Sequence, residues 1–443
     1  MTGAPAASAP GRSPVASPAH GSGSSRAGSS SRVVLQPEKM RRINRRVLLN
    51  RLQALGTASR ADLAKTLGLS QPTAGKIVDE LLTGGVLEEV VAPEATAHNG
   101  TNARLGRPGR LLRLDQRRAR FVAIQLGVRQ TRLSPVPVGG NTEDSWASET
   151  LTPASAPDWF ADQRRAAARI KSKDFWGVLV SVPGIVDEAG GRVLFSPNLH
   201  WTEQAGLAER IQEIWKAPVL LVQEERALAL GHHAVVPTLD DFLLVDFGEG
   251  VGGAVIVDGR PHANPLPVSG ELGHTPVLGN RRACGCGSTG CLETLVSQQG
   301  LLTSFEKTQR SRTCTWEALV AHVAQHGVVP WLADALDATG AIIAGAVNVL
   351  GLRHVVLTGC LTEFRGTVVE HLTAAIRSGA LWGRFGEIVV QTAPRRRIAG
   401  LVAMGLDRLV LPLAGEGHLE RSAGRRNSNG APVGSAGGSL GDR

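Results

Sequence analysis

The chain has 443 residues, 42% of them hydrophobic and 20% charged, which is typical of a soluble protein large enough for two to three domains. A formal net charge of +9 permits a polyanionic partner but does not establish one. Five cysteines, three of them clustered, argue against a secreted disulfide framework, and no hydrophobic signal segment opens the chain, so we expect a cytoplasmic protein.

The two ends of the chain, residues 1–37 and 413–443, are rich in Gly, Ala, Ser and Pro. Segments of this composition bury too little apolar surface to order themselves, so we expect disordered tails. The most apolar run, Ala341 to Leu352, is too short to span a bilayer. We expect this run to form a buried helix, and we expect no association with a membrane.

Order is expected to begin at Glu38 with three short helices. The first, residues 38–55, carries apolar side chains at helical spacing among several arginines. Its predicted apolar positions are Ile43, Val47, Leu48, Leu52 and Leu55. Ser59 and Ser70 are expected to cap the second and third helices. Glycines are expected to end all three, at Gly56, Gly68 and Gly84–Gly85.

After the third helix, the segments VLEEVVAP and RPGRLLRLD alternate like two strands around a polar loop. They predict the wing of a winged helix-turn-helix domain spanning residues 38–116, and the partner is then double-stranded operator DNA. The third helix would present to a major groove the residues Ser70, Gln71, Thr73, Ala74 and Lys76. Arginines of the first helix would contact phosphates or the minor groove, as would those of the wing, Arg104, Arg107 and Arg110.

Two alternatives stay open for this region. Residues 38–116 could instead form a helical protein-interaction domain whose arginine face is merely solvated. Gly75, inside the third helix, costs about 1 kcal/mol of helix stability relative to Ala, or it allows the backbone to approach DNA closely.

From Arg120 onward, short apolar segments alternate with helical stretches. FVAIQLGV, WGVLVSVPGIVD and APVLLVQEE each predict a strand, and FLLVDFGEGVGGAVIVDG predicts two strands joined by a Gly-rich turn. HVVLTGC predicts a last strand. This alternation indicates the α/β class with substantial sheets.

The stretch from Ser269 to Glu293 places one His and three Cys within eighteen residues: His274, Cys284, Cys286 and Cys291. Cys-x-Cys-x4-Cys with a nearby His is typical of a tetrahedral zinc site, and the interleaved glycines let the backbone fold tightly around one ion. The alternative is a group of free cysteines that bind nothing.

These residues resemble the ROK family of repressors, open reading frames and sugar kinases. NRRVLLNRL…SRADLAKTLGLSQPTAGKIVDEL resembles the helix-turn-helix of its regulators, and GELGH…CGCGSTGCLE resembles its zinc signature. VPGIVD…GRVLFSPNLHW, DFGEGVGGAVIVDG and VVLTGC resemble its sugar loop, second phosphate hairpin and adenosine-side turn. The resemblance implies a two-lobed, actin-like ATPase (sugar kinase) fold, with residues 117–412 as the sugar-binding domain.

The resemblance also implies a sugar site. His274 would bind zinc and face the sugar, and Glu271 and Glu293 would accept hydrogen bonds from its hydroxyls. The other implied sugar-binding residues are Asn198, Gln223 and Glu224. The zinc would be structural, since it would hold the imidazole at one angle. Either glutamate could instead be a solvated surface acid.

The chain departs from the family's kinases where they carry out catalysis. They have an Asn-Asp pair, with Asp as the base, where this chain has Gln223 and Glu224, and we expect Arg226 to hold Glu224 ionised in a salt bridge. Their first phosphate loop has an acid and small residues where this chain runs from Gln125 to Arg129, and residues 131–140 do not resemble an ordered hairpin. Gly248, Gly250 and Gly252 of the second loop remain, so we predict no catalytic residue, with Glu224 a degenerate base position.

The first hypothesis is therefore a sugar-responsive transcriptional regulator, expected to be a repressor and a homodimer or higher homo-oligomer. A ligand would change DNA affinity by favouring one arrangement of lobes and recognition helices over another. The second hypothesis is an active ATP-dependent sugar kinase with an appended DNA-binding domain. The third is a regulator whose sugar pocket has lapsed and which responds to a protein partner.

Overall fold

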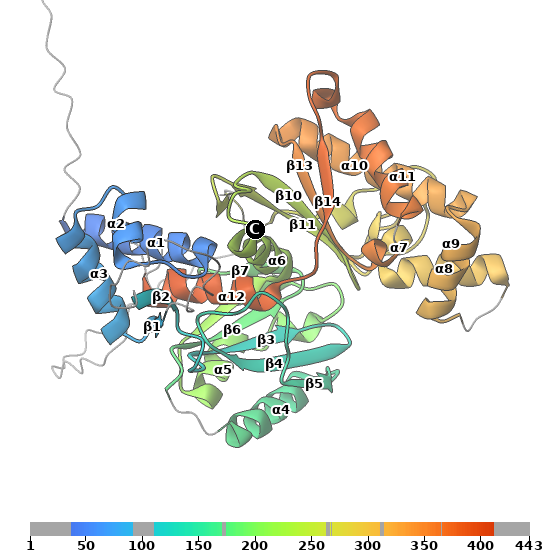
Figure 1. Ribbon diagram of the computed structural model, residues 1–443. Coiled ribbons are helices and arrows are strands. Elements are labelled where there is room, and N and C mark those ends of the chain that lie inside the picture. The colour runs from blue at the N-terminus through green and yellow to red at the C-terminus, as the bar shows by residue number, and fades with distance from the viewer. Residues whose placement is uncertain are drawn as a thin grey trace, which may run out of the picture.

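The computed structural model describes residues 37–91, 110–170, 174–262, 266, 268–310, 314–364 and 366–411 (Figure 1). The predicted C-terminal tail and all but the last residue of the predicted N-terminal tail lie outside the described residues. So do two of the predicted wing residues, Arg104 and Arg107.

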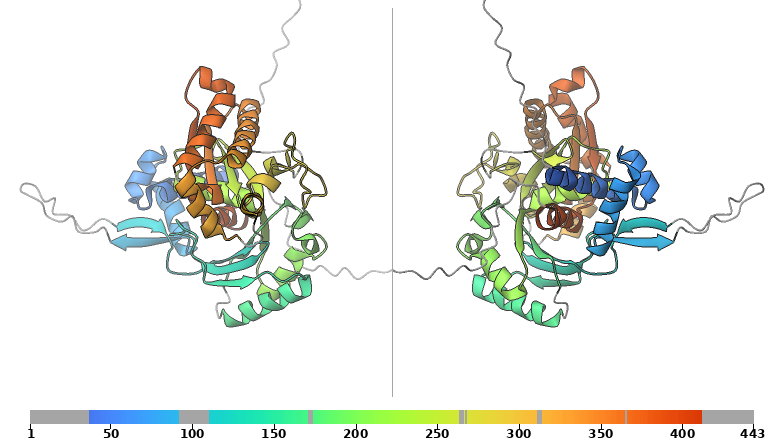
Figure 2. Two further views of the ribbon diagram at one scale, coloured as in Figure 1. Left: turned by 90° about the vertical axis from the view of Figure 1, so that its right-hand side faces the viewer. Right: turned by 90° about the vertical axis from the view of Figure 1, so that its left-hand side faces the viewer.

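The N-terminal unit has the predicted three helices and two strands. They are α1 (Pro37–Leu55), α2 (Arg60–Thr66), α3 (Gln71–Thr83), β1 (Leu87–Val91) and β2 (Arg110–Leu114). Ser59 and Ser70 cap α2 and α3 as predicted, since each side chain accepts a hydrogen bond from a backbone N–H of the first turn. β1 pairs with β2 in antiparallel fashion, and Figure 2 shows this hairpin extending away from the rest of the molecule.

The buried face of α1 differs from the prediction. Val47 and Leu55 are 46% and 42% exposed, whereas Leu49, which was not assigned to the apolar face, is 4% exposed. Leu48, Leu49 and Leu52 form the buried stripe. Each helical residue advances by about 100°, so Val47 lies on the side of Leu48 opposite to Leu49 and faces solvent.

The first lobe contains a five-stranded sheet in the order β5-β4-β3-β6-β9. Its strands are β3 (Phe121–Leu126), β4 (Gln130–Val136), β5 (Ser148–Leu151), β6 (Gly177–Val182) and β9 (Val219–Gln223). Alternate residues of β3 enter different cores, because successive side chains of a strand point to opposite faces. Val122 and Ile124 pack with α4 (Ala156–Arg169) and α5 (Leu207–Trp215), whereas Phe121 and Ala123 face α12 (Arg397–Gly405).

The second lobe repeats this arrangement. Its strands are β10 (Phe242–Phe247), β11 (Val251–Val257), β12 (Arg260–Pro261), β13 (His354–Gly359) and β14 (Val389–Thr392), in the order β12-β11-β10-β13-β14. In both sheets the first three strands in sequence pair with one another in antiparallel fashion. The fourth strand then pairs in parallel with the first, and the fifth pairs in parallel with the fourth. The helices on its outer face are α7 (Glu293–Val296), α8 (Gln298–Gln309), α9 (Trp316–His326), α10 (Pro330–Leu350) and α11 (Thr367–Gly379).

Helix α6 (Glu224–Val235) lies between the two sheets (Figure 1). Its Ala227 belongs to the core of the first lobe, and its Leu228 and Ala229 pack with Phe242 of the second. It packs closely against α12 along its length. The cores are also continuous with the N-terminal unit, since Leu48 of α1 belongs to the same hydrophobic cluster as Ala227.

The segment after β3 corrects the prediction for residues 131–140, because β4 is an ordered strand paired with both β3 and β5. Thr131 and Leu133 are buried while Arg132 is more exposed, so the segment does alternate. Pro135 has no backbone N–H to donate to a neighbouring strand. It is tolerated because the pairing of β4 with β5 ends at Leu133, opposite Ser148, so Pro135 has no partner on that side.

The apolar run at 341–352 is helical as far as Leu350, where the longer helix α10 ends. The run is only partly buried, since Ile343 and Val347 are 1% exposed but Val349 is 87% exposed. Among the described residues, α10 alone has the length and composition of a membrane span, with 21 residues. Leu332, Leu336, Ile343 and Val347 of α10 are at most 1% exposed and belong to the core of the second lobe. This burial is typical of a core helix.

Candidate functional site

A cavity of about 540 Å³ lies between the two lobes. Five of the six predicted sugar-binding residues line it: Asn198, Glu224, Glu271, His274 and Glu293. Gln223 does not line the cavity, but its side-chain amide donates to Glu271 Oε1 at 3.3 Å. The fold therefore brings together residues from four separate parts of the sequence.

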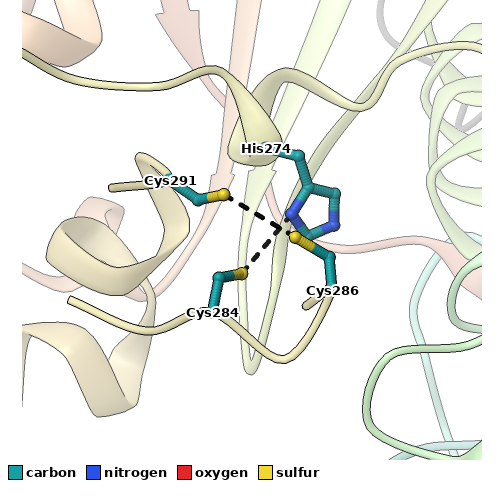
Figure 3. Close-up of side chains that lie close together, drawn as sticks. All are labelled: His274, Cys284, Cys286 and Cys291. Carbon is teal, nitrogen blue, oxygen red and sulfur yellow. Dashed lines mark hydrogen bonds between the residues drawn. The ribbon is translucent and has the colours of Figure 1, made fainter. Parts of the chain in front are cut away.

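The four predicted metal ligands converge on one point (Figure 3). Their candidate donor atoms all lie within 4.8 Å of one another: His274 Nδ1 or Nε2 and the Sγ atoms of Cys284, Cys286 and Cys291. Cys284 and Cys286 lie on one tight loop, where Gly287 has a φ of +87° that favours glycine. Cys291 closes the loop and His274 belongs to the short helical turn η2 (Leu272–His274).

The spacing of these atoms fits a tetrahedral ion. A Zn²⁺ ion with Zn–S distances of about 2.3 Å and Zn–N of about 2.0–2.1 Å requires S···S separations of about 3.8 Å and S···N separations of about 3.6 Å. Cys286 Sγ lies 3.7 Å from Cys291 Sγ, and Cys284 Sγ lies 3.6 Å from His274 Nδ1. These residues therefore form a cluster able to bind a metal.

The two ring nitrogens of His274 face different groups. Nδ1 points toward Cys284, whereas Nε2 lies 3.7 Å from Glu271 Oε2 on the cavity side. Glu293 is held by the backbone N–H of Val251, which donates to its Oε2 at 2.9 Å. Metal cluster and cavity wall thus share one histidine.

The predicted salt bridge between Arg226 and Glu224 is wrong. Arg226 pairs with Glu188 at 2.8 Å, and Glu224 instead accepts from Arg397 Nε at 2.7 Å. Residues two apart on a helix do not face each other, so Arg226 points away from Glu224. Arg397, with 5% of its side chain exposed, also lies 3.6 Å from Asp144.

The turn after β3 is occupied by a carboxylate of the other lobe. Glu249, in the β10–β11 turn, accepts from the backbone N–H groups of Val128 and Arg129 at 3.1 and 3.3 Å. It also pairs with Arg129 Nε at 3.1 Å. The amide groups that would cradle a phosphate in this turn therefore already bind a carboxylate.

Asp246, at the end of β10, forms a bidentate pair with Arg395 at 2.7 and 2.9 Å. Burial alone would raise the pKa of Asp246, but Arg395 and the Thr358 hydroxyl hold it below its usual value. Nearby, Gln125 donates to Glu224 at 3.2 Å. Three of the acids that line the cavity, namely Glu224, Asp246 and Glu249, are thus engaged by neighbouring side chains.

Sequence reasoning missed Glu225, Asp246, Glu249, Arg395 and Arg397, all of which line the cavity. The signal for Glu249 was present, because an acid stands inside the glycine-rich turn. The arginines gave no local signal, since they follow β14 and reach the cavity only through the return of the chain to the first lobe.

On the N-terminal unit, four of the five residues predicted to face the major groove are exposed: the N-cap Ser70 and, within α3, Gln71, Thr73 and Lys76. Ala74 is 1% exposed and packs inside the unit, so its assignment to a DNA-contacting surface is wrong. Its neighbour Thr73 is exposed, because successive helical residues lie about 100° apart.

The arginines around this helix are only partly available. Arg110 is 64% exposed but pairs with Glu89 at 2.6 Å, and Arg45 pairs with Glu80 of α3. Arg46 pairs with Asp407, which follows α12. Arg45 therefore links α1 to α3, and Arg46 links α1 to the segment after α12, so these two arginines of α1 are engaged within the molecule, whereas Arg51 is exposed.

Several known proteins are similar to this chain. The model of the family described as "ROK family" matches residues 161–405. The xylose repressor of Caldicellulosiruptor bescii is 23% identical over 407 residues, covering 84% of this chain and 98% of its own length. The DNA-binding transcriptional dual regulator NagC of Escherichia coli is 25% identical over 369 residues, covering 77% and 86%.

Among solved structures, a ROK family transcriptional regulator described as a homolog of the Escherichia coli MLC protein superposes with a TM-score of 0.66. The two chains are 21% identical, and the match covers 83% of this chain and 97% of the other. This likeness confirms the predicted two-lobed fold and includes the N-terminal helical unit.

Proposed function

Because this chain belongs to the ROK family, we propose that it is a sugar-responsive transcriptional regulator that binds operator DNA through residues 38–116 and a sugar in the cavity of residues 117–412. We further propose that it acts in the cytoplasm as a repressor and as a homodimer or higher homo-oligomer. The names of its relatives, a xylose repressor and a DNA-binding dual regulator, support a regulator over an enzyme.

The observation that carries this proposal is that the groups that a sugar kinase would use for catalysis are already bound by other residues of the chain. The candidate base Glu224 is bound by Arg397 and Gln125, and a carboxylate fills the first phosphate turn. A base must be free to take a proton, and phosphate loops need vacant N–H donors. The sugar-facing wall, in contrast, keeps Asn198, Glu271, His274 and Glu293.

The metal cluster has a structural role in this proposal. Zn²⁺ held by His274, Cys284, Cys286 and Cys291 would fix the imidazole at one angle against Glu271. A closed set of four protein ligands is typical of structural zinc, whereas catalytic zinc keeps an open position. The ion would thereby brace the sugar-facing wall.

The candidate DNA-contacting residues in this proposal are Ser70, Gln71, Thr73, Lys76 and Arg110 among the described residues. Arg104 and Arg107 remain candidates from the sequence alone. The exposed, capped N-terminus of α3 supports a recognition helix, because the first turn of such a helix contacts base edges.

The test is operator binding by the full chain with and without sugars. An operator would be selected from a random duplex library, and its affinity measured against glucose, mannose, xylose and N-acetylglucosamine. At least one sugar is expected to change operator affinity by tenfold or more, which is about 1.4 kcal/mol of coupling. DNA binding that no sugar changes, together with no sugar binding by calorimetry, would favour control by a protein partner.

A coupled ATPase assay on the same sugars decides between the regulator and the kinase. We expect no turnover above background, because the base and the phosphate turn are already engaged. Robust phosphorylation of any sugar would overturn the purely regulatory assignment.

A further inference from the structure

Two turns from opposite lobes meet across the cavity. One joins β3 to β4 in the first lobe and contains Val128 and Arg129, and the other joins β10 to β11 in the second lobe and contains Glu249. All three residues line the cavity. Glu249 is 120 residues away from Arg129 in the sequence, so the two turns meet only because the fold places the lobes face to face.

The carboxylate of Glu249 uses both of its oxygens in this contact. Oε2 accepts from the backbone N–H groups of Val128 and Arg129 at 3.1 and 3.3 Å, and Oε1 lies 3.1 Å from Arg129 Nε. Two successive amides and a guanidinium together form a donor site that suits one anion. The side chain of Arg129 is 55% exposed, so the ion pair alone would contribute little and the two amide bonds matter more.

The second lobe holds its own turn in place and adds a further contact. The backbone N–H of Gln298, at the start of α8, donates to the carbonyl oxygen of Gly248 at 2.9 Å. Arg129 also reaches this helix, since its Nη2 donates to Gln299 Oε1 at 3.1 Å. The first lobe is therefore attached both to the turn that carries Glu249 and to the helix that supports this turn.

This link is separate from the chain connections between the lobes. The chain leaves the first lobe through α6, and it returns from β14 to α12. These two helices pack against each other. The contact of Glu249 is formed instead by two turns that no short stretch of chain connects, so it depends on the carboxylate and its three donors.

We propose that Glu249 is a built-in anion that ties the two lobes together across the cavity. The tie needs no bound phosphate, because the carboxylate occupies the place that a free anion would take on Val128 and Arg129. Removing the carboxylate therefore both breaks a link between the lobes and vacates an anion site made of the chain's own donors. The inference is independent of the ligand of the cavity, since it concerns only this contact.

Glu249→Ala in the full-length chain tests both consequences. Glu249 does not have a positive φ, so alanine is compatible with the turn. In hydrogen–deuterium exchange, the amides of Val128 and Arg129 should exchange at least tenfold faster than in wild type, because they lose their acceptor. Small-angle X-ray scattering should show a larger radius of gyration for the variant, because the lobes separate.

Inorganic phosphate distinguishes a tie from a merely structural turn. Millimolar phosphate should slow the exchange of both amides in Glu249→Ala and return its radius of gyration toward that of wild type, because phosphate binds the vacated donors. It should leave the wild-type protein unchanged, because the carboxylate already occupies these donors. A phosphate effect that is the same in both proteins, or absent from both, overturns the proposal.

Glu149→Ala is the matched control. Glu149 pairs at 2.6 Å with Arg132, another arginine that lines the cavity, but the two residues stand on neighbouring strands of the first lobe. This variant also loses a pair of an acid and an arginine, yet it should keep the wild-type radius of gyration and gain no response to phosphate.

Arg129→Ala provides a second test should Glu249→Ala not fold. It removes the guanidinium and the contact with Gln299 but keeps the two amide bonds to Glu249. The radius of gyration is therefore expected to increase, by less than in Glu249→Ala. A wild-type radius of gyration in folded Arg129→Ala, like one in folded Glu249→Ala, overturns the tie.

Discussion

Glu225 is the residue whose surroundings are least suited to its charge. Burial raises the pKa of its carboxyl group well above the usual 4.5, and the neighbouring Glu224, Glu271 and Asp246 raise it further. The folded protein therefore binds a proton at Glu225 more tightly than the unfolded chain does. Folding is then linked to pH through this one group.

Glu225→Gln is expected to change the pH dependence of stability. A raised pKa in the folded state means that the contribution of Glu225 is fully present below about pH 4.5 and is lost as pH rises through the folded value. The variant should therefore gain stability relative to wild type as the pH rises above about 4.5. Thermal unfolding of both proteins across this range measures the difference. A difference that is constant with pH would show that the group does not titrate there.

Cys284→Ser is expected to lose the metal. Three remaining ligands bind Zn²⁺ far more weakly than four, and the loop around residues 284–291 loses its anchor. Elemental analysis of the purified protein should find a small fraction of the wild-type zinc, and sugar binding should weaken at least tenfold. Cys314→Ser, at a cysteine outside the cluster, should leave both unchanged. Wild-type zinc content in Cys284→Ser would contradict the ligand assignment.

At the scale of elements, the crossing of α6 and α12 depends on glycine. A Cβ on Gly400 would lie 1.7 Å from the Ala227 carbonyl oxygen, and one on Gly231 would lie 1.8 Å from that of Arg396. Two helices approach this closely only where side chains are absent. Because α6 begins at the cavity and α12 carries Arg397, this contact fixes the position of the candidate site.

Gly400→Ala is therefore expected to lower the free energy of unfolding by at least about 1–3 kcal/mol, since the helices must separate. Gly345→Ala provides the control. It lies inside α10 with nothing within 4 Å of the added Cβ, so it should raise stability by about 0.5–1 kcal/mol. Urea titrations would measure both, and an equal effect of the two substitutions would contradict the close contact.

Helix α3 is the element that we expect to enter the DNA. Lys76→Ala should weaken operator binding and reduce the slope of log affinity against log salt by about one, because one phosphate contact is lost. Lys307→Ala, at an exposed lysine of α8, should change neither. Fluorescence anisotropy at several salt concentrations is the measurement. An unchanged salt slope in Lys76→Ala would remove this residue from the contact set.

At the scale of the whole molecule, α6 and α12 link the cavity to the DNA-binding unit. Glu224 and Arg397 meet at the cavity end, and Asp407, just beyond α12, pairs with Arg46 of α1. α1 also packs directly against α6 (Figure 2). A sugar that moves the start of either helix can therefore shift the position of the recognition helix, provided that it binds one arrangement better than the other.

Asp407→Asn is expected to weaken this coupling while leaving each binding site in place. Operator and sugar should each bind within about threefold of wild type, but the factor by which sugar changes operator affinity should fall at least threefold. Asp162→Asn, which removes an exposed ion pair with Arg165 on α4, is the matched control. Full coupling in Asp407→Asn would show that the signal does not pass through this contact.

Much of the molecule was predictable because its signals are local. Hydrophobic spacing and serine caps predict α1, α2 and α3, and His274 with the three cysteines predicts the metal cluster from spacing alone. Where local signals misled, the cause was the direction of a side chain. Ala74 lies on the predicted recognition helix but faces inward, and Val47 lies in an apolar run but faces solvent.

The sequence by itself therefore determined the class of fold, the winged helix-turn-helix unit and the residue types of the cavity wall for which we propose a sugar ligand. Only the tertiary structure decided which charges neutralise one another. Arg397 reaches Glu224 across 173 residues, and Glu249 reaches Val128 across 121. Such pairs carry no local periodicity, because their partners are distant in the sequence and meet only in the folded chain. In the proposed function, these pairs are what distinguishes this cavity from that of a sugar kinase.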